Sequence, residues 1–228
     1  MPIIMISLEW LQILFLWGIP LIFAITVHEV AHGWMANQLG DPTAKMLGRL
    51  TLNPIKHIDL IGTILLPVIL VLLKIGFMFG WAKPVPVTWI NLRNPKRDMA
   101  FVAVAGPIAN LFMAFGWAAA AKLGLWLIAV PGSKIGLSLY YMGIIGIRIN
   151  CVLLLLNLLP LPPLDGSRIL SSFLAPKVLN HYMRLEPYGF FILLALLLAG
   201  ILNKVLLPLT LGLFNIISAS FGLSLTTL

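Results

Sequence analysis

The pair His28 and His32 is the feature of this sequence with the clearest chemical potential. The two lie four residues apart in the stretch Ile25 to Trp34, so on a helix both imidazoles point to one face. Two ring nitrogens at that spacing can hold one metal ion. Glu29 lies beside the first histidine, where its carboxylate can reach a water on that metal. Zinc lowers the pKa of such a water toward neutrality, and a carboxylate can then accept its proton.

The pattern H-E-x-x-H is a signature of zinc metalloproteases. It also arises by chance, and in a soluble helix such a histidine pair is commonly an ordinary surface feature. Here the pattern lies inside an apolar run that begins near Leu8. Two histidines and a carboxylate are expensive to place in an apolar segment, and there they are functional by default.

The composition places the chain in the lipid bilayer. Its 228 residues are 61% hydrophobic and 10% charged, with a mean hydropathy of +1.05. A soluble domain of this size cannot bury so much apolar surface, so the predicted fold class is an all-α polytopic membrane protein. The net charge of +8 comes from lysines and arginines in short loops, as the positive-inside rule expects, and does not indicate a nucleic-acid partner.

Apolar runs predict a bundle of about five to six transmembrane helices. The runs cover residues 8–38, 60–79, 99–123, 135–159, 188–202 and 205–221. The last two are either two short spans or one kinked pair. We expect a single transmembrane domain over residues 1–228, with a catalytic core at about 8–170 and C-terminal helices at about 187–221.

The run Leu60 to Phe79 is expected to be irregular. Because Gln38 and Met99 must lie on the same side of the membrane, this run crosses an even number of times, as a re-entrant or interfacial segment. A single crossing would instead break part of the site assignment. Short membrane-associated strands are expected near the active site at 49–52 and 80–87. The second stretch is either an edge strand that pairs with an unwound substrate or a proline-rich loop packed on the bundle.

A catalytic zinc usually takes three protein ligands, so the histidine pair needs one more. Asp165 is the favoured candidate, because a rigid proline pair precedes it and Gly166 follows it. If the first span and the span ending at Leu159 run parallel, their ends meet near His28. Asn110, early in an antiparallel span, falls at the same level. Asp59 is the runner-up ligand, or simply a helix N-cap.

Three motifs in order resemble the site-2 protease family of intramembrane zinc metalloproteases. They are residues 28–32 (HEVAH), 106–110 (GPIAN), and 157–160 (NLLP) leading to 164–166 (LDG). The stretches 53–59 and 80–87 are similar to its small prokaryotic branch without a PDZ or CBS domain. The resemblance covers about residues 25–169. It implies regulated intramembrane proteolysis, in which a peptide bond within or near a transmembrane segment of a membrane protein substrate is hydrolysed.

The resemblance also implies roles for individual residues. One Zn²⁺ per chain would be held by His28, His32 and Asp165, with Glu29 as the general base. Asn110 and Asn157 match two asparagines that the family places near the metal. By this resemblance they would hold the substrate backbone or the oxyanion. The alternative for both is an interhelical hydrogen bond, which is common in membrane bundles.

The expected location is the cell membrane, with a multi-pass topology and the active site near the cytoplasmic side. The alternative function is a membrane ion transporter or channel that uses the buried His/Asp site. Transporters more often show paired broken helices in two repeated halves, and no internal repeat is evident. An inactive homologue acting as a scaffold is a further alternative, against which the intact Glu29 argues. The roles of His57 and Arg148 stay open.

Overall fold

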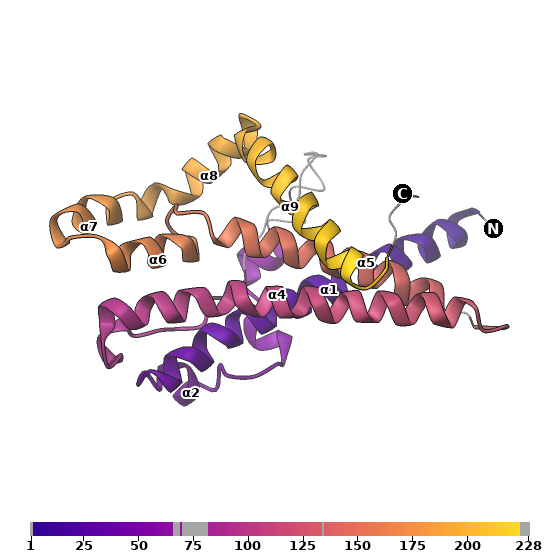
Figure 1. Ribbon diagram of the computed structural model, residues 1–228, viewed down its shortest axis with the longest axis horizontal. Helices are drawn as coiled ribbons and strands as arrows, with labels where there is room; N and C mark the ends of the chain where they lie inside the picture. The colour runs from indigo at the N-terminus through magenta and orange to yellow at the C-terminus, as the bar shows by residue number, and fades with distance from the viewer. Residues whose placement is uncertain (1, 66–68, 70–81, 134, 224–228) are drawn as a thin grey trace.

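The computed structural model describes residues 2–65, 69, 82–133 and 135–223, and all regular structure in them is helical (Figure 1). The α-helices are α1 (Pro2–Gln38), α2 (Thr43–Met46), α4 (Pro95–Ile128), α5 (Ile135–Asn157), α6 (Asp165–Phe173), α7 (Pro176–Met183), α8 (Gly189–Leu198) and α9 (Ile201–Ser220). Shorter helical turns are η1 (Pro54–His57), η2 (Leu60–Leu65), η3 (Trp89–Asn91) and η4 (Glu186–Tyr188).

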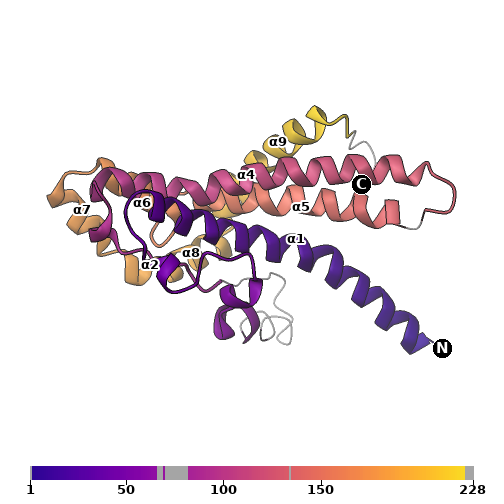
Figure 2. The ribbon, with the colours of Figure 1, turned by 90° about the horizontal axis from the view of Figure 1, so that it is seen from below.

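Helices α1 and α5 run in the same direction, and α4 runs in the opposite direction alongside α5 (Figures 1 and 2). The N–H of Arg93 donates to the carbonyl of Leu39 at 3.0 Å, so α1 ends where α4 begins. Likewise the N–H of Lys83 donates to the carbonyl of His57 at 2.9 Å. The described residues on either side of the run 60–79 therefore lie side by side. Most of the predicted re-entrant run lies outside the described residues, and its first turn, η2, is a π-helix.

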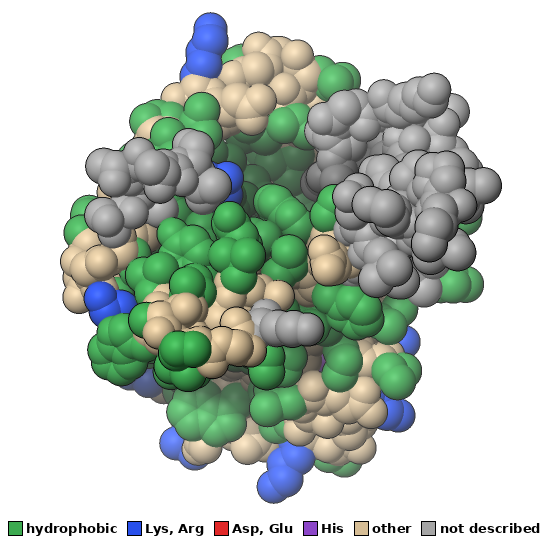
Figure 3. Space-filling view, turned by 90° about the vertical axis from the view of Figure 1, so that its right-hand side faces the viewer, with side chains coloured by type: hydrophobic (Ala, Val, Ile, Leu, Met, Phe, Trp, Pro, Cys, Tyr) green, Lys and Arg blue, Asp and Glu red, His purple; other side chains and the backbone are tan. Residues whose placement is uncertain are grey.

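Four helices in the described residues are long and apolar enough to cross a membrane: Gln12–Gln38 of α1, α4, α5 and α9. Apolar side chains cover much of one end of the molecule, with basic side chains around the margin (Figure 3). These four helices support the prediction of a helical membrane protein. In the described residues they are fewer than the five to six spans predicted. Helix α8 has ten residues, about 15 Å, against a hydrocarbon core of about 30 Å. Gly200, with φ of 72°, lies in the break between α8 and α9, so the two do not form one continuous helix.

Small residues let α4 and α5 pack closely. A Cβ on Gly143 would lie 2.6 Å from the Cβ of Ala121, and no larger side chain fits there. Helix α9 crosses this pair (Figure 1) and contributes Phe214 and Ile217 to the same buried cluster. Close backbone approach and side-chain packing are what hold helices together in lipid, where the hydrophobic effect gives no driving force. The α4–α5–α9 unit is thus a firm support for the polar residues that α4 and α5 carry.

The predicted strands do not occur in the described residues. Residues 49–52 follow a turn, and 82–88 form an irregular segment. Pro84 and Pro86 have no N–H, and the N–H of Val85 donates to Glu29 instead of a neighbouring strand. The guanidinium of Arg49 donates to the carbonyls of Lys83 and Pro84 at 2.9 and 3.3 Å. The described part of 80–87 is therefore a packed proline-rich loop, and residues 80 and 81 lie outside the description.

Candidate metal centre and catalytic site

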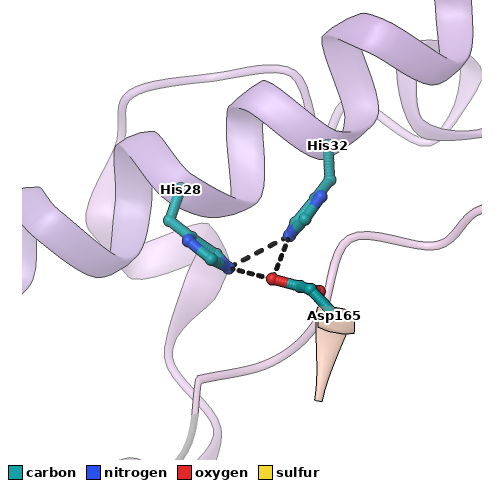
Figure 4. A group of neighbouring side chains, drawn as sticks. All are labelled: His28, His32 and Asp165. Atoms are coloured by element: carbon teal, nitrogen blue, oxygen red, sulfur yellow. Dashed lines mark hydrogen bonds and ion pairs between the residues drawn. The ribbon is translucent and has the colours of Figure 1, made fainter. Parts of the chain in front are cut away.

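Helix α1 places His28 and His32 one turn apart, and α6 brings Asp165 to them at its first residue (Figure 4). The two Nε2 atoms lie 3.0 Å apart, with the rings edge to face. Asp165 Oδ2 lies 3.2 Å from Nε2 of His28 and 3.3 Å from Nε2 of His32. In the described residues these three form the one group of His, Cys, Asp or Glu side chains suited to a metal ion. Asp165 thus meets the two histidines although it lies 133 positions after His32 in the sequence.

Hydrogen bonds on the other ring nitrogens determine what each imidazole offers. Nδ1 of His28 lies 2.6 Å from Oδ1 of Asn110, and Nδ1 of His32 lies 2.7 Å from the carbonyl of Val102. Both partners are acceptors, so both Nδ1 atoms carry the proton. In the neutral rings each Nε2 therefore presents a lone pair. This arrangement, with the non-ligating nitrogen bonded to an oxygen, is typical of metal-binding histidines.

The oxygen of Asp165 that faces the histidines is buried and receives no hydrogen bond. An anionic oxygen and two nitrogen lone pairs consequently converge within 3.0–3.3 Å of one another. Three electron-rich atoms so close repel unless a cation lies between them. Tetrahedral ligands at typical Zn–N and Zn–O lengths would lie about 3.3–3.4 Å apart, so the residues fit zinc.

Glu29 shares a cavity of about 350 Å³ with the three candidate ligands. Its Oε2 accepts a hydrogen bond from the N–H of Val85 at 2.7 Å, which holds the carboxylate on the cavity side of α1. The cavity also includes Asn157 and Arg168. A partly exposed carboxylate beside a metal site is suited to accept a proton from water.

The structure brings the two predicted asparagines near the centre in different ways. Asn110 is fully buried on α4 and touches His28 directly. Asn157 ends α5 and lines the cavity, with its side-chain amide donating to the carbonyl of Leu153 at 3.0 Å. Asn110 thus contacts a candidate ligand, whereas Asn157 lines the cavity beside the candidate ligands.

The other residues considered from the sequence lie elsewhere. Asp59 Oδ1 accepts from the N–H groups of Ile61 and Gly62, at 3.1 and 2.7 Å, so it caps the turn that follows. His57 is buried in η1, with Nε2 2.9 Å from the carbonyl of Thr51. The guanidinium of Arg148 lies 5.6 Å from the ring centre of Phe214, which gives this intramembrane cation an aromatic partner.

Two residues at the centre, Gly106 and Asn150, had no role assigned to them from the sequence. A Cβ on Gly106 would lie 2.4 Å from Nε2 of His32, so a glycine is required where α4 passes the imidazoles. Asn150 is fully buried on α5 and donates no bond to a ligand, but it hydrogen-bonds Asn110 at 2.9 Å. The available signal was its spacing: Asn150 lies seven residues, or two turns, before Asn157 in an apolar span.

Comparison with known proteins agrees with this centre. The chain is 41% identical over 199 residues to "Putative zinc metalloprotease YwhC" of Bacillus subtilis (strain 168), which is 83% of each chain. It is 31% identical over 185 residues to "Putative zinc metalloprotease Rip2" of Mycolicibacterium smegmatis, covering 80% of this chain and 66% of that protein. A segment of 70 residues is 41% identical to "Putative zinc metalloprotease MJ0611" of Methanocaldococcus jannaschii, covering 31% of this chain and 32% of that protein.

Two further comparisons give no match: no family model matches the chain, and no solved structure does. The fold and the His28, His32 and Asp165 group define a helical membrane protein with a candidate metal site. Given its likeness to YwhC, the chain belongs to the family of proteins named as zinc metalloproteases.

Proposed function

We propose that the protein is an intramembrane zinc endopeptidase of the site-2 protease type. It hydrolyses a peptide bond within or near a transmembrane segment of a membrane protein substrate. The observation that carries this proposal is the convergence of two imidazole lone pairs and one carboxylate oxygen in a cavity that also holds Glu29. The metalloprotease names of the relatives support the reaction class.

In this proposal one Zn²⁺ per chain is held by His28, His32 and Asp165. When bound, it supplies Lewis-acid chemistry that activates water and polarises a peptide carbonyl. Glu29 accepts a proton from the attacking water and later delivers it to the amide nitrogen that leaves, so the proton balance closes within the site. The N–H of Val85 keeps the accepting oxygen in place through both steps.

Asn157 is proposed to donate its side-chain amide to the substrate oxygen that becomes negative. The residue lines the cavity, and one donated bond to Leu153 leaves its amide with a further N–H to offer. Its position at the end of α5 also suits a substrate helix that unwinds near the membrane face. The proposed location is the cell membrane, with the site toward the cytoplasm, because the positive-inside rule assigns basic loops to that side.

The test is co-expression with tagged single-span membrane proteins, comparing wild type with Glu29→Gln. The glutamine keeps the size of the side chain but cannot take a proton near neutral pH. We expect the variant to fold and retain zinc, with cleavage reduced about 10²–10⁴-fold. Asp59→Asn is the matched control, because it removes a carboxylate that caps a turn away from the centre. It should cleave as wild type does.

Two results would contradict the proposal. Cleavage by Glu29→Gln at close to the wild-type rate would remove the general base. A wild-type protein that cuts no substrate but changes ion flux in vesicles would instead favour a transporter, which no observation in the described residues supports.

A further inference from the structure

The two candidate histidine ligands are held in the same protonation form by partners of different kinds. His32 Nδ1 faces a backbone carbonyl, which can only accept, so its proton position is determined by the backbone alone. His28 Nδ1 faces a side-chain amide, that of Asn110. An amide has an accepting oxygen at one end and a donating NH₂ at the other. A rotation of that amide by 180° would therefore reverse what His28 meets.

A reversed amide would disable His28 as a ligand. With NH₂ toward the ring, Nδ1 would have to accept and Nε2 would carry the proton. That N–H would point at the place where the three ligand atoms converge, and a protonated nitrogen cannot bind a metal. The centre thus needs something that selects one orientation of the Asn110 amide.

A chain of buried hydrogen bonds makes this selection. The side-chain NH₂ of Asn150 donates to the carbonyl of Gly146 at 2.8 Å, one turn earlier on α5. Oδ1 of Asn150 therefore faces Asn110 and accepts its NH₂ at 2.9 Å. The second hydrogen of that NH₂ points to the carbonyl of Ala24 at 3.4 Å. In the reversed orientation the Asn110 oxygen would face the Asn150 oxygen, and two acceptors would meet without a proton between them.

We propose that Asn150 is a positioning residue that sets the tautomer of His28, acting through Asn110. The donor-to-acceptor direction of these hydrogen bonds is set at one end by the Gly146 carbonyl, which can only accept. At the other end it leaves the lone pair of His28 on Nε2. The Ala24 carbonyl favours the same orientation, but over a distance half an ångström longer. Both asparagines are fully buried. If Asn150 is removed, no water can therefore take its place as the acceptor for Asn110. The proposal rests on the zinc site of the proposed function.

The test measures the proton position and the metal separately from proteolysis. The protein is labelled with ¹⁵N-histidine, and His28→Ala identifies the resonances of His28. In the metal-free protein at pH 8, ring ¹⁵N shifts report which nitrogen carries the proton. Zinc affinity is measured by chelator competition on the same samples. The variants are Asn150→Leu, which has similar volume and no polar atom, and Asn150→Asp, which keeps an oxygen that accepts from Asn110.

We expect wild type to show one His28 tautomer, protonated at Nδ1. Asn150→Leu should show both tautomers and bind zinc about 10–100-fold more weakly, as found when groups that orient a metal ligand are lost. Asn150→Asp should restore the single tautomer. Cys151→Ala is the matched control, because Cys151 is an equally buried neighbour on α5 that packs in the apolar cluster and should leave both readouts unchanged.

Asn150→Leu with one Nδ1-protonated tautomer and wild-type zinc affinity would overturn the proposal. If that variant does not accumulate, Asn150→Ala replaces it with the same expectations and the same overturning result. A mixture of tautomers in Asn150→Asp equal to that in the leucine variant would also overturn it. Failure of the wild type to bind zinc would instead refute the metal site of the proposed function, so the two failures are distinct.

Discussion

Gly106→Ala should abolish the metal site while leaving the helix bundle folded. A Cβ at this position would lie 2.4 Å from Nε2 of His32 and 2.5 Å from Cε1 of His28. Ordinary contacts begin near 3.4 Å, so the two imidazoles would have to retreat by about 1 Å. Metal–ligand distances tolerate only about 0.2 Å. Both nitrogens would leave the coordination geometry together, and we expect zinc affinity to fall about 100-fold or more.

The stability of this variant should change far less than its metal affinity. Alanine in a helix interior gains about 0.5–1 kcal/mol over glycine, and overpacking costs about 1–3 kcal/mol. The net loss is at most about 2.5 kcal/mol. Gly116→Ala is the control on the same helix, because nothing lies within 4 Å of its new Cβ. It should bind zinc normally and be slightly more stable.

The assay is zinc per chain by elemental analysis, chelator competition for affinity, and thermal unfolding of both metal-free variants. If Gly106→Ala binds zinc as tightly as Gly116→Ala, the imidazoles do not meet the metal where α4 passes them. The convergence of lone pairs would then have another explanation.

The remaining predictions concern stability, topology and ligands. Asp41 is fully buried and accepts from the N–H groups of Thr43 and Thr88, so Asp41→Ala should lose about 3 kcal/mol of unfolding free energy in denaturant titrations. Burial raises the pKa of Asp41, but hydrogen bonds from the hydroxyl of Thr43, the side-chain amide of Asn91 and the N–H groups of Thr88 and Thr43 outweigh burial and lower this pKa below its unfolded value. The contribution of Asp41 to stability should therefore be full above about pH 5 and fade as pH falls through the folded pKa. A pH-independent difference between wild type and variant would refute this. Single cysteines at Lys45 and Arg93 should both react with an impermeant reagent from one side of the membrane only, and opposite sidedness would contradict the shared end of α1 and α4. Asp165→Ala should lose most of the one zinc per chain, and full retention in elemental analysis would remove it from the site.

Much of the centre could be predicted because the direction in which each span crosses the membrane determines which residues reach the same depth. The pattern HEVAH places two ligands on one helix face, and a parallel span ending before Asp165 brings the third. Asn110 followed from the same argument, since an antiparallel span returns to the same depth. These inferences need only helix periodicity and the rule that apolar runs cross the membrane.

The rest depends on how helices pair, which one sequence does not reveal. The partner of His32 is the carbonyl of Val102, and every residue has a carbonyl. Asn150 matters because the glycines of α5 bring it against α4, a contact set by packing and not by periodicity. The predicted strands failed because Arg49 and Glu29 take up the backbone groups that a strand would have paired.

The length of α4 determines how deep the centre lies. Its 34 residues span about 51 Å, against a hydrocarbon thickness of about 30 Å. Even a tilt of about 40° accommodates only about 26 residues, so this hydrophobic mismatch leaves about eight residues projecting. Lys96, Arg97 and Asp98 place the projecting turns at the N-terminal end. Val102 is the eighth residue of α4, so at this tilt we expect the imidazole that it orients to lie at the edge of the hydrocarbon layer, where water has only a short path to reach it.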